Sequence, residues 1–141
     1  KGEVLIQTAF PNNNFWHTLF NGGYKKIAEI GLDERKNTSW PPFTYLALIR
    51  SSAFQYSDAY SFLNKLKIHL SKNKNLKLKI LGPVEAPMAR KAGRHRAQLL
   101  LQSIDRQTLH HSLDTVRIKM ESDTLSRKTR WSIDVDPIEL L

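Results

Sequence analysis

From residue 43 onward, the sequence predicts an α+β domain with a four-stranded antiparallel sheet and two helices on one face. The first observation is the order of the periodic segments, which runs strand, helix, strand, strand, helix, strand. The second is that the first and third predicted strands are apolar on both faces, whereas the second and fourth alternate apolar and polar residues. This pattern suits two central and two edge strands, which is the arrangement of the ferredoxin-like βαββαβ fold.

The first half of this domain begins with FTYLALIRSSA, residues 43–53, whose apolar residues occupy both faces of a strand. A Ser-Asp pair at 57–58 can cap the helix that follows. Apolar side chains recur along this helix at the spacing of one face, at Ala59, Phe62, Leu63, Leu66 and Leu70. The segment LKLKILG, residues 76–82, alternates strictly with Lys77 and Lys79 on its outer face, and so predicts a strand at a sheet edge.

The second half repeats the sequence of strand and helix. A basic connection stiffened by prolines, residues 82–94, leads to RAQLLLQ, residues 96–102, which is apolar on both faces. Ser103 or Asp105 caps a second helix. The apolar face of this helix comprises Leu109, Leu113, Val116 and Met120. The last predicted strand, TRWSIDVDP at residues 129–137, alternates and ends at its proline.

The first 38 residues cannot close a core alone. A short apolar strand within residues 2–8 is followed by predicted helices at 15–20 and 24–36, which Asn21-Gly22-Gly23 separates. Because a single strand has no partner here, we expect this segment to be the tail of a larger domain. The double proline after Trp40 enforces an extended connection. We therefore predict a boundary between a segment at 1–38 and a domain at 39–141.

The formal net charge is +9, and its placement is informative. Residues 65–96 contain ten Lys and Arg residues against one acid, Glu85, which indicates a polyanion partner, either nucleic acid or an acidic peptide. The alternative is that this charge only keeps the protein in solution. No apolar run approaches the roughly 18 residues that span a bilayer, and no cysteine is present for disulfides or thiolate zinc sites. We expect a monomeric cytoplasmic protein and, because no initial Met is present, a piece of a longer chain.

Six cations of the second and third predicted strands and their connection are the candidate DNA-binding residues. They are Lys77, Lys79, Arg90, Lys91, Arg94 and Arg96. The third strand carries no aromatic residue on which bases could stack, so these cations are expected to contact phosphates and not to distinguish bases. Arg106 and His110 are one turn apart at the rim of the second apolar helix face, and they form a candidate dock for an acidic peptide with a hydrophobic end. Ordinary solvated side chains are the alternative there.

Motifs for catalysis or metal binding are absent from the sequence. Neither a phosphate-binding glycine loop nor an HExxH motif occurs. His110 and His111 point about 100° apart on a helix, so they do not share a ligand face. Asp134 and Asp136 share one face of a predicted edge strand, where ion pairs are the favoured interpretation. We predict no catalytic residue and no metal site in this chain.

Four segments resemble a known family nearly from end to end. They are GEVLIQT at 2–8, WPPFTYLALIR at 40–50, GPVEAPMARKAGRHRAQLLLQ at 82–102 and RWSIDVDPIEL at 130–140. The family is that of primosomal protein N′, the ATP-dependent DNA helicases of bacterial replication restart, and the resemblance is to its C-terminal portion. The last two segments are the most distinctive of the four.

The resemblance implies that residues 1–38 end the second RecA-like helicase lobe and that residues 39–141 form the family's C-terminal domain. It implies a DNA-binding and partner-docking module of an enzyme that unwinds stalled forks 3′ to 5′ with ATP and assembles the primosome. The expected partners are branched or single-stranded DNA, single-stranded DNA-binding protein and other primosome proteins. ATP, magnesium and zinc are expected only in the parent protein, because this segment has no ATP-binding motif and is not expected to be an enzyme alone.

Two rival functions within the family concern protein contacts. The domain could serve only to bind the acidic tail of single-stranded DNA-binding protein, or it could brace the motor lobe. Arg106 stands where the family has a basic residue linked to the tail site, whereas His110 stands where the family can have glutamine.

Overall fold

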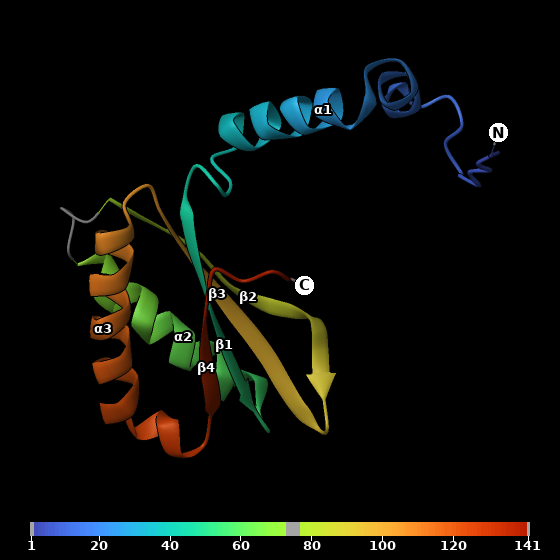
Figure 1. The fold of residues 1–141 in the computed structure, drawn as a ribbon. Coiled ribbons are helices and arrows are strands. Elements are labelled where there is room, and N and C mark those ends of the chain that lie inside the picture. The colour runs from blue at the N-terminus through green and yellow to red at the C-terminus, as the bar shows by residue number, and fades with distance from the viewer. Residues whose placement is uncertain (1, 73–76, 141) are drawn as a thin grey trace. The chain divides into compact units, whose positions relative to one another are not determined.

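The computed structural model describes residues 2–72 and 77–140. Contacts divide the chain into two compact units, Lys1–Trp40 and Pro41–Leu141, whose elements are drawn in Figure 1. Leu76, the first residue of the predicted edge strand, and Lys74 of the basic window lie outside the described residues. No helix in the described ranges is long and apolar enough to cross a membrane.

The first unit contains one kinked helix, α1 (Asn14–Asn37). Asn13 caps its N-terminus, where the side-chain carbonyl accepts the backbone N–H of Phe15 at 2.8 Å. Gly23 has a φ of 64° and a ψ of −172°, so the helix is interrupted at the predicted break. The two predicted helices are therefore confirmed as the two arms of α1.

The predicted strand within residues 2–8 is wrong. None of these residues is in a strand, and Val4 and Leu5 are 83% and 89% exposed. An extended segment needs a neighbouring strand to satisfy its backbone and cover its side chains, and the described residues of this unit provide none. No residue of α1 is buried. The described part of the first unit therefore contains no RecA-like sheet.

The second unit has two layers, a sheet and a pair of helices on one of its faces (Figure 1). The sheet is antiparallel with the order β2-β3-β1-β4, from β1 (Tyr45–Ala53), β2 (Leu78–Lys91), β3 (Arg94–Ser103) and β4 (Arg130–Val135). The helices are α2 (Tyr56–Ser71) and α3 (Arg106–Ser122), and the 3₁₀ helix η1 (Thr124–Arg127) leads into β4. The predicted α+β class, with two helices on a four-stranded antiparallel sheet, is confirmed.

The core lies between the helices and the sheet. Every residue of the two predicted apolar helix faces is buried. Alternate residues of the central strands meet these faces, namely Ala47, Ile49, Ala97, Leu99 and Leu101. Asp105 caps α3, as predicted. The 57–58 pair does not cap α2, because that helix already begins at Tyr56 and places Asp58 in its first turn, where a carboxylate suits the helix dipole.

The connection predicted at residues 82–94 is wrong, because β2 continues through most of it. Lys91 pairs with Arg94, so the two strands form a long hairpin closed by Ala92 and Gly93. Both turn residues have positive φ, 49° and 73°, as a two-residue type I′ turn requires. Register shifts interrupt the pairing around the two prolines, which have no N–H to donate. Because of those shifts, the apolar alternation of a strand is not visible in the sequence.

Gly82 is expected to be the least replaceable residue of β2. It has a φ of 102°, and an added Cβ would lie 3.0 Å from the Gln98 carbonyl oxygen and 3.1 Å from the Val84 nitrogen. Gly82→Ala is therefore expected to lower the free energy of unfolding by about 1–3 kcal/mol, measured by urea denaturation. Gly93→Asn is the control, since Gly93 has open space around it and Asn tolerates positive φ. Equal losses in both variants would contradict this explanation.

The C-terminal residues after β4 cross the face of the sheet opposite the helices (Figure 1). Arg50 of β1 and Gln98 of β3 donate hydrogen bonds to the carbonyl oxygens of Glu139 and Leu140, at 3.1 and 3.3 Å. Leu48 of β1, whose side chain points to this face, is 1% exposed. The first predicted strand is therefore buried on both faces, as its sequence indicates.

Candidate nucleic-acid interface

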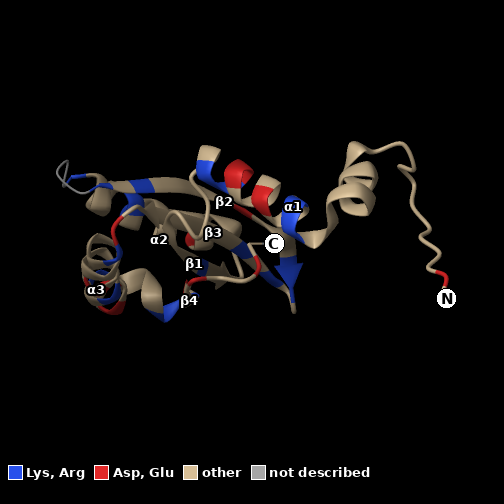
Figure 2. Ribbon diagram, turned by 45° about the horizontal axis from the view of Figure 1, so that its top comes forward, with Lys and Arg blue, Asp and Glu red and all other residues tan. Residues whose placement is uncertain are grey.

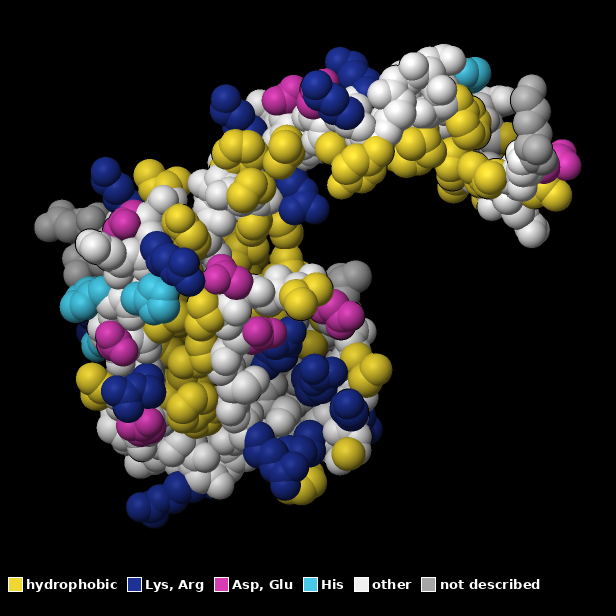
Figure 3. Space-filling model, in the orientation of Figure 1, with side chains coloured by type: hydrophobic (Ala, Val, Ile, Leu, Met, Phe, Trp, Pro, Cys, Tyr) yellow, Lys and Arg dark blue, Asp and Glu magenta, His cyan; other side chains and the backbone are white. Residues whose placement is uncertain are grey.

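Cations that are distant in the sequence gather at one end of the sheet. At this end Ser52 of β1 pairs with Arg96 of β3 on one side and with Arg130 of β4 on the other. The tip of the β2–β3 hairpin, with exposed Arg90 and Lys91, lies at the same end. We call this region the hairpin end and define it by Arg90, Lys91, Arg94, Arg96, Arg127, Lys128 and Arg130. Figure 2 marks basic residues at the end of β2 and at the connection into β4, and Figure 3 shows Lys and Arg side chains gathered over the lower part of the hairpin.

Sequence reasoning missed Arg127, Lys128 and Arg130 as candidate DNA-binding residues. They lie more than thirty positions after the hairpin turn, and only the strand order, which places β4 beside β1, brings them to the same end. The run RKTR at 127–130 was the signal that could have pointed to them, since it holds three cations in four positions. The structure thus enlarges the candidate interface beyond the basic window.

Lys77 and Lys79 lie at the opposite end of the sheet. Lys79 pairs with Gln102, and the Lys77 carbonyl oxygen accepts a hydrogen bond from the Ser103 hydroxyl at 3.0 Å. At about 3.3 Å per residue, the strand between Lys79 and Lys91 spans roughly 30 Å or more. The six predicted DNA-binding cations therefore do not form one surface.

Arg94 is held in place by the protein itself. Its Nη2 donates to the carbonyl oxygens of Ser52 and Lys128, at 3.0 and 3.3 Å. Its Cζ lies 4.5 Å from the centre of the Phe54 ring, which is a cation–π arrangement. Arg94 is therefore less available to a flat ligand surface than exposed Arg90 and Lys91, although its charge contributes to the same region.

The predicted dock at Arg106 and His110 lies near the end of the sheet away from the hairpin. Asp105 caps α3 and accepts the backbone N–H groups of Gln107 and Thr108, at 3.3 and 2.8 Å. The hydrogen bonds from the Thr108 hydroxyl and from these N–H groups lower the pKa of Asp105. The cap fixes where α3 begins, and so it positions the side chains of its first turns.

Arg106 has internal contacts but remains accessible. Its guanidinium lies 5.7 Å from the centre of the Tyr45 ring and 3.8 Å from the Asp136 carboxylate, with 61% of the side chain exposed. His110 is exposed on the same helix. An acidic ligand could reach Arg106, where it would share the guanidinium with Asp136 or replace it.

The carboxylates that the sequence singled out are paired with cations. Asp134 lies 2.7 Å from Arg50, and Asp136 is the partner of Arg106. Among the described residues, no three His, Asp or Glu side chains gather in a manner that could hold a metal ion. The ion pairs that the sequence analysis favoured for these aspartates are thereby confirmed.

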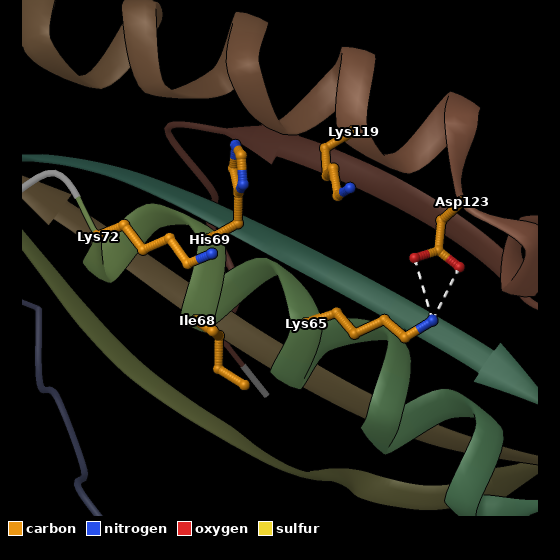
Figure 4. Close-up of a pocket in the computed structure, with 6 residues that line it drawn as sticks. All are labelled: Lys65, Ile68, His69, Lys72, Lys119 and Asp123. Carbon is orange, nitrogen blue, oxygen red and sulfur yellow. Dashed lines mark hydrogen bonds and ion pairs between the residues drawn. The ribbon is translucent and has the colours of Figure 1, made fainter.

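A concave surface lies between α2 and α3 (Figure 4). This pocket, of about 300 Å³, is lined by Lys65, Ile68, His69, Lys72, Lys119 and Asp123. The Lys65 ammonium donates to both carboxylate oxygens of Asp123 at 3.3 Å, which neutralises one of its cations. Lys119 points from α3 toward the space between the helices. With Lys65 paired, this pocket holds fewer unpaired cations than the hairpin end.

The pair of Asp123 and Lys65 is expected to make stability depend on pH. Burial raises the pKa of Asp123, but the Leu125 N–H and the Lys65 ammonium together lower it more, to below its ordinary value of 3.8. Such a carboxylate stabilises the fold above its unfolded pKa and loses this contribution as the pH falls through the folded pKa. Asp123→Asn is therefore expected to lower Tm at pH 7 by roughly 4–8 °C, corresponding to about 1 kcal/mol.

Thermal melts of Asp123→Asn and the unmodified chain from neutral to acidic pH check this prediction, and the difference in Tm is expected to shrink below about pH 4. The matched control is Glu121→Gln, because the Arg117–Glu121 pair is 3.7 Å apart and more than half exposed. A Tm difference for Asp123→Asn that stays constant at all pH values would exclude an ionic origin.

The family of the chain follows from a comparison with known proteins. The model of the primosomal protein N C-terminal domain matches residues 36–138. The chain belongs to this family. The family resemblance is thereby confirmed, and the match includes all strands of the sheet and both helices that cover it.

Relatives in this family are similar along almost the whole chain. The replication restart protein PriA of Haemophilus influenzae is 35% identical over 99% of this chain, and that of Bacillus subtilis is 26% identical over 99%. The chain covers 19% and 17% of these two proteins, so it spans less than a fifth of the length of either relative. Among solved structures, the de novo designed protein Foldit4 matches 68% of this chain and 99% of its own, with a TM-score of 0.52 and 7% identity. That likeness concerns the fold alone.

Proposed function

We propose that this chain is a DNA-binding module of a replication-restart protein and that the hairpin end contacts the phosphate backbone. The observation that carries the proposal is the convergence of two basic segments, from the β2–β3 hairpin and from the start of β4, at one end of the sheet. Among the described residues, no cation of the hairpin end forms a salt bridge. Their charge is therefore available to an external polyanion.

The proposed contact reads the backbone and not the bases. On the face opposite the helices, β3 presents Arg96, Gln98, Leu100 and Gln102, with no aromatic ring among them. His95 points to the helix side, where its ring lies 6.2 Å from that of Tyr56. Without a stacking platform on this face of β3, phosphate contacts are expected to supply most of the affinity, and binding is expected to be salt-dependent and largely independent of sequence.

Comparing the two ends of the sheet tests this proposal. Fluorescence anisotropy with single-stranded and forked oligonucleotides would compare the unmodified chain with a triple variant, Arg90→Gln, Lys91→Gln and Arg96→Gln. The triple variant is expected to lose most of the affinity. The matched control is Lys77→Gln with Lys79→Gln, which neutralises lysines at the far end and is expected to keep most of it. A stronger loss in the control would move the DNA contact to that end, and no DNA binding by any form would refute the proposal.

A second candidate function is the docking of an acidic peptide with a hydrophobic end, such as the tail expected from the family resemblance. The accessible guanidinium of Arg106 beside the Tyr45 ring favours it. Arg106→Ala is expected to weaken binding of such a peptide without changing DNA affinity. Arg117→Ala on the same helix is the control, because Arg117 is similarly exposed but lies beyond this site. Equal peptide affinity in both variants would exclude this dock.

The finer family features belong to the proposal. The strand order β2-β3-β1-β4 supports a ferredoxin-like assignment of the second unit. Assignment of residues 1–38 to a motor lobe, or of the domain to bracing that lobe, is a proposal about the parent protein. The same holds for ATP-dependent unwinding, for magnesium and zinc, and for a cytoplasmic location.

A further inference from the structure

A pocket of about 440 Å³ opens at the hairpin end, where the residues after β1 and those before β4 face the start of β3. Its lining includes the cations Arg94, Arg127, Lys128 and Arg130, and one carboxylate, Asp58. None of these four cations forms a salt bridge with any described residue. The pocket therefore concentrates positive charge that the protein does not neutralise.

The guanidinium of Arg94 is a preorganised part of this lining. Two backbone carbonyl oxygens and the Phe54 ring fix its orientation. These three groups are uncharged, so they do not neutralise the guanidinium. Its Nε is buried and has no hydrogen-bond partner. A buried donor without a partner is destabilising, so its presence here suggests that a ligand completes the site.

Thr129 provides a second unused donor in the same pocket. The residue is only 4% exposed, and its hydroxyl oxygen also lacks a hydrogen-bond partner. The neighbouring residues Lys128 and Arg130 are exposed and line the same pocket, so cations flank Thr129 on both sides in the sequence. The two buried polar atoms without partners in the described residues thus belong to residues that line one concave, positively charged surface.

The chemistry of this lining selects an oxyanion. A phosphate group offers several acceptor oxygens with a negative charge, which matches a guanidinium N–H, a hydroxyl and surrounding cations. We propose that the pocket binds a phosphate group of a nucleic-acid strand. The assignment of this phosphate to a nucleic-acid strand rests on the proposed function and on the position of the pocket. Arg96 and Arg130 flank Ser52 on neighbouring strands, so their backbones are about 10 Å apart. A strand bound along the hairpin is therefore adjacent to the pocket.

Thr129→Val tests the proposal, because valine keeps the shape of the side chain and removes only the hydroxyl. In anisotropy titrations with single-stranded DNA, its affinity is expected to fall about 3- to 10-fold. Thr124→Val, at an exposed position outside the pocket, is the control and is expected to bind like the unmodified chain. Arg127→Gln, an exposed lining residue whose replacement does not disturb the core, is expected to reduce affinity as well.

A second measurement monitors the pocket without DNA. Inorganic phosphate is expected to shift the NMR signals of the Arg94 Nε–H group and the Thr129 amide, whereas chloride at equal ionic strength is not. If Thr129→Val binds DNA like the control while the hairpin triple variant loses binding, the inference is overturned and the proposed function stands. If the unmodified chain binds no DNA, the proposed function fails. In that case, phosphate-specific NMR shifts would show that the pocket binds free phosphate. The absence of such shifts would show that the pocket binds no phosphate at all.

Discussion

Replacing Arg90 and Lys91 together by glutamate is expected to lower the affinity of the chain for single-stranded DNA by at least about 100-fold at low salt. Both residues are exposed beside a two-residue turn, so the change leaves the core intact. Each replacement removes an attraction to a phosphate and adds a repulsion. The measurement is an anisotropy titration, with circular dichroism to verify the fold.

The matched control for this prediction is the pair Lys77→Glu and Lys79→Glu, which changes the net charge by the same amount at the other end of the sheet. A loss of less than about tenfold is expected, since screening confines surface charges to roughly 10 Å at ordinary ionic strength. Equal losses in the two double variants would show that net charge, and not the position of the hairpin end, determines DNA affinity.

Phe62→Ala is expected to lower the free energy of unfolding of the second unit by about 3–5 kcal/mol. Phe62 is 1% exposed in the core between α2 and the sheet, where it is among the largest fully buried side chains. Truncation leaves a cavity that the sheet and both helices cannot fill without moving. Because small domains are stable by about 5–15 kcal/mol, much of the stability is lost.

Urea denaturation measures this effect, with Ile68→Ala as the control on the same helix. Ile68 is 53% exposed, so its truncation is expected to cost less than about 1 kcal/mol. A loss below about 1.5 kcal/mol for Phe62→Ala would mean that the described core is loosely packed at this point.

The sheet and its helices could be predicted because their local patterns agree with the final packing. The apolar residues around Phe62 and around Leu109 recur at the spacing of one helix face, and both central strands are apolar on each face. The second half of β2 could not be recognised, since Pro83 and Pro87 require register shifts that break the alternation. The strand at residues 2–8 was predicted from a short apolar run, and such a run does not form a strand where a partner strand is lacking.

The candidate site was predictable only in part. The basic residues of the hairpin could be recognised because they are close together in the sequence. Lys79 was wrongly grouped with them, because most of the strand between Lys79 and Lys91 was predicted to be a loop. Arg130 joins the site through pairing between β4 and β1, a long-range contact that spacing does not report. The fixed guanidinium of Arg94 depends on carbonyl oxygens whose positions only the structure gives.

The salt dependence of DNA binding tests the central claim most directly. Affinity for a labelled single strand would be measured between about 50 and 200 mM salt, where each neutralised phosphate contributes a slope of about −0.7 in a plot of log K against log salt. With Arg96 and the five exposed cations of the hairpin end engaged, the unmodified chain is expected to show a slope of about −4. Arg90→Gln, Lys91→Gln and Arg96→Gln together are expected to bring the slope about 2 units closer to zero. A slope that the triple variant leaves unchanged would contradict the assignment of DNA binding to the hairpin end.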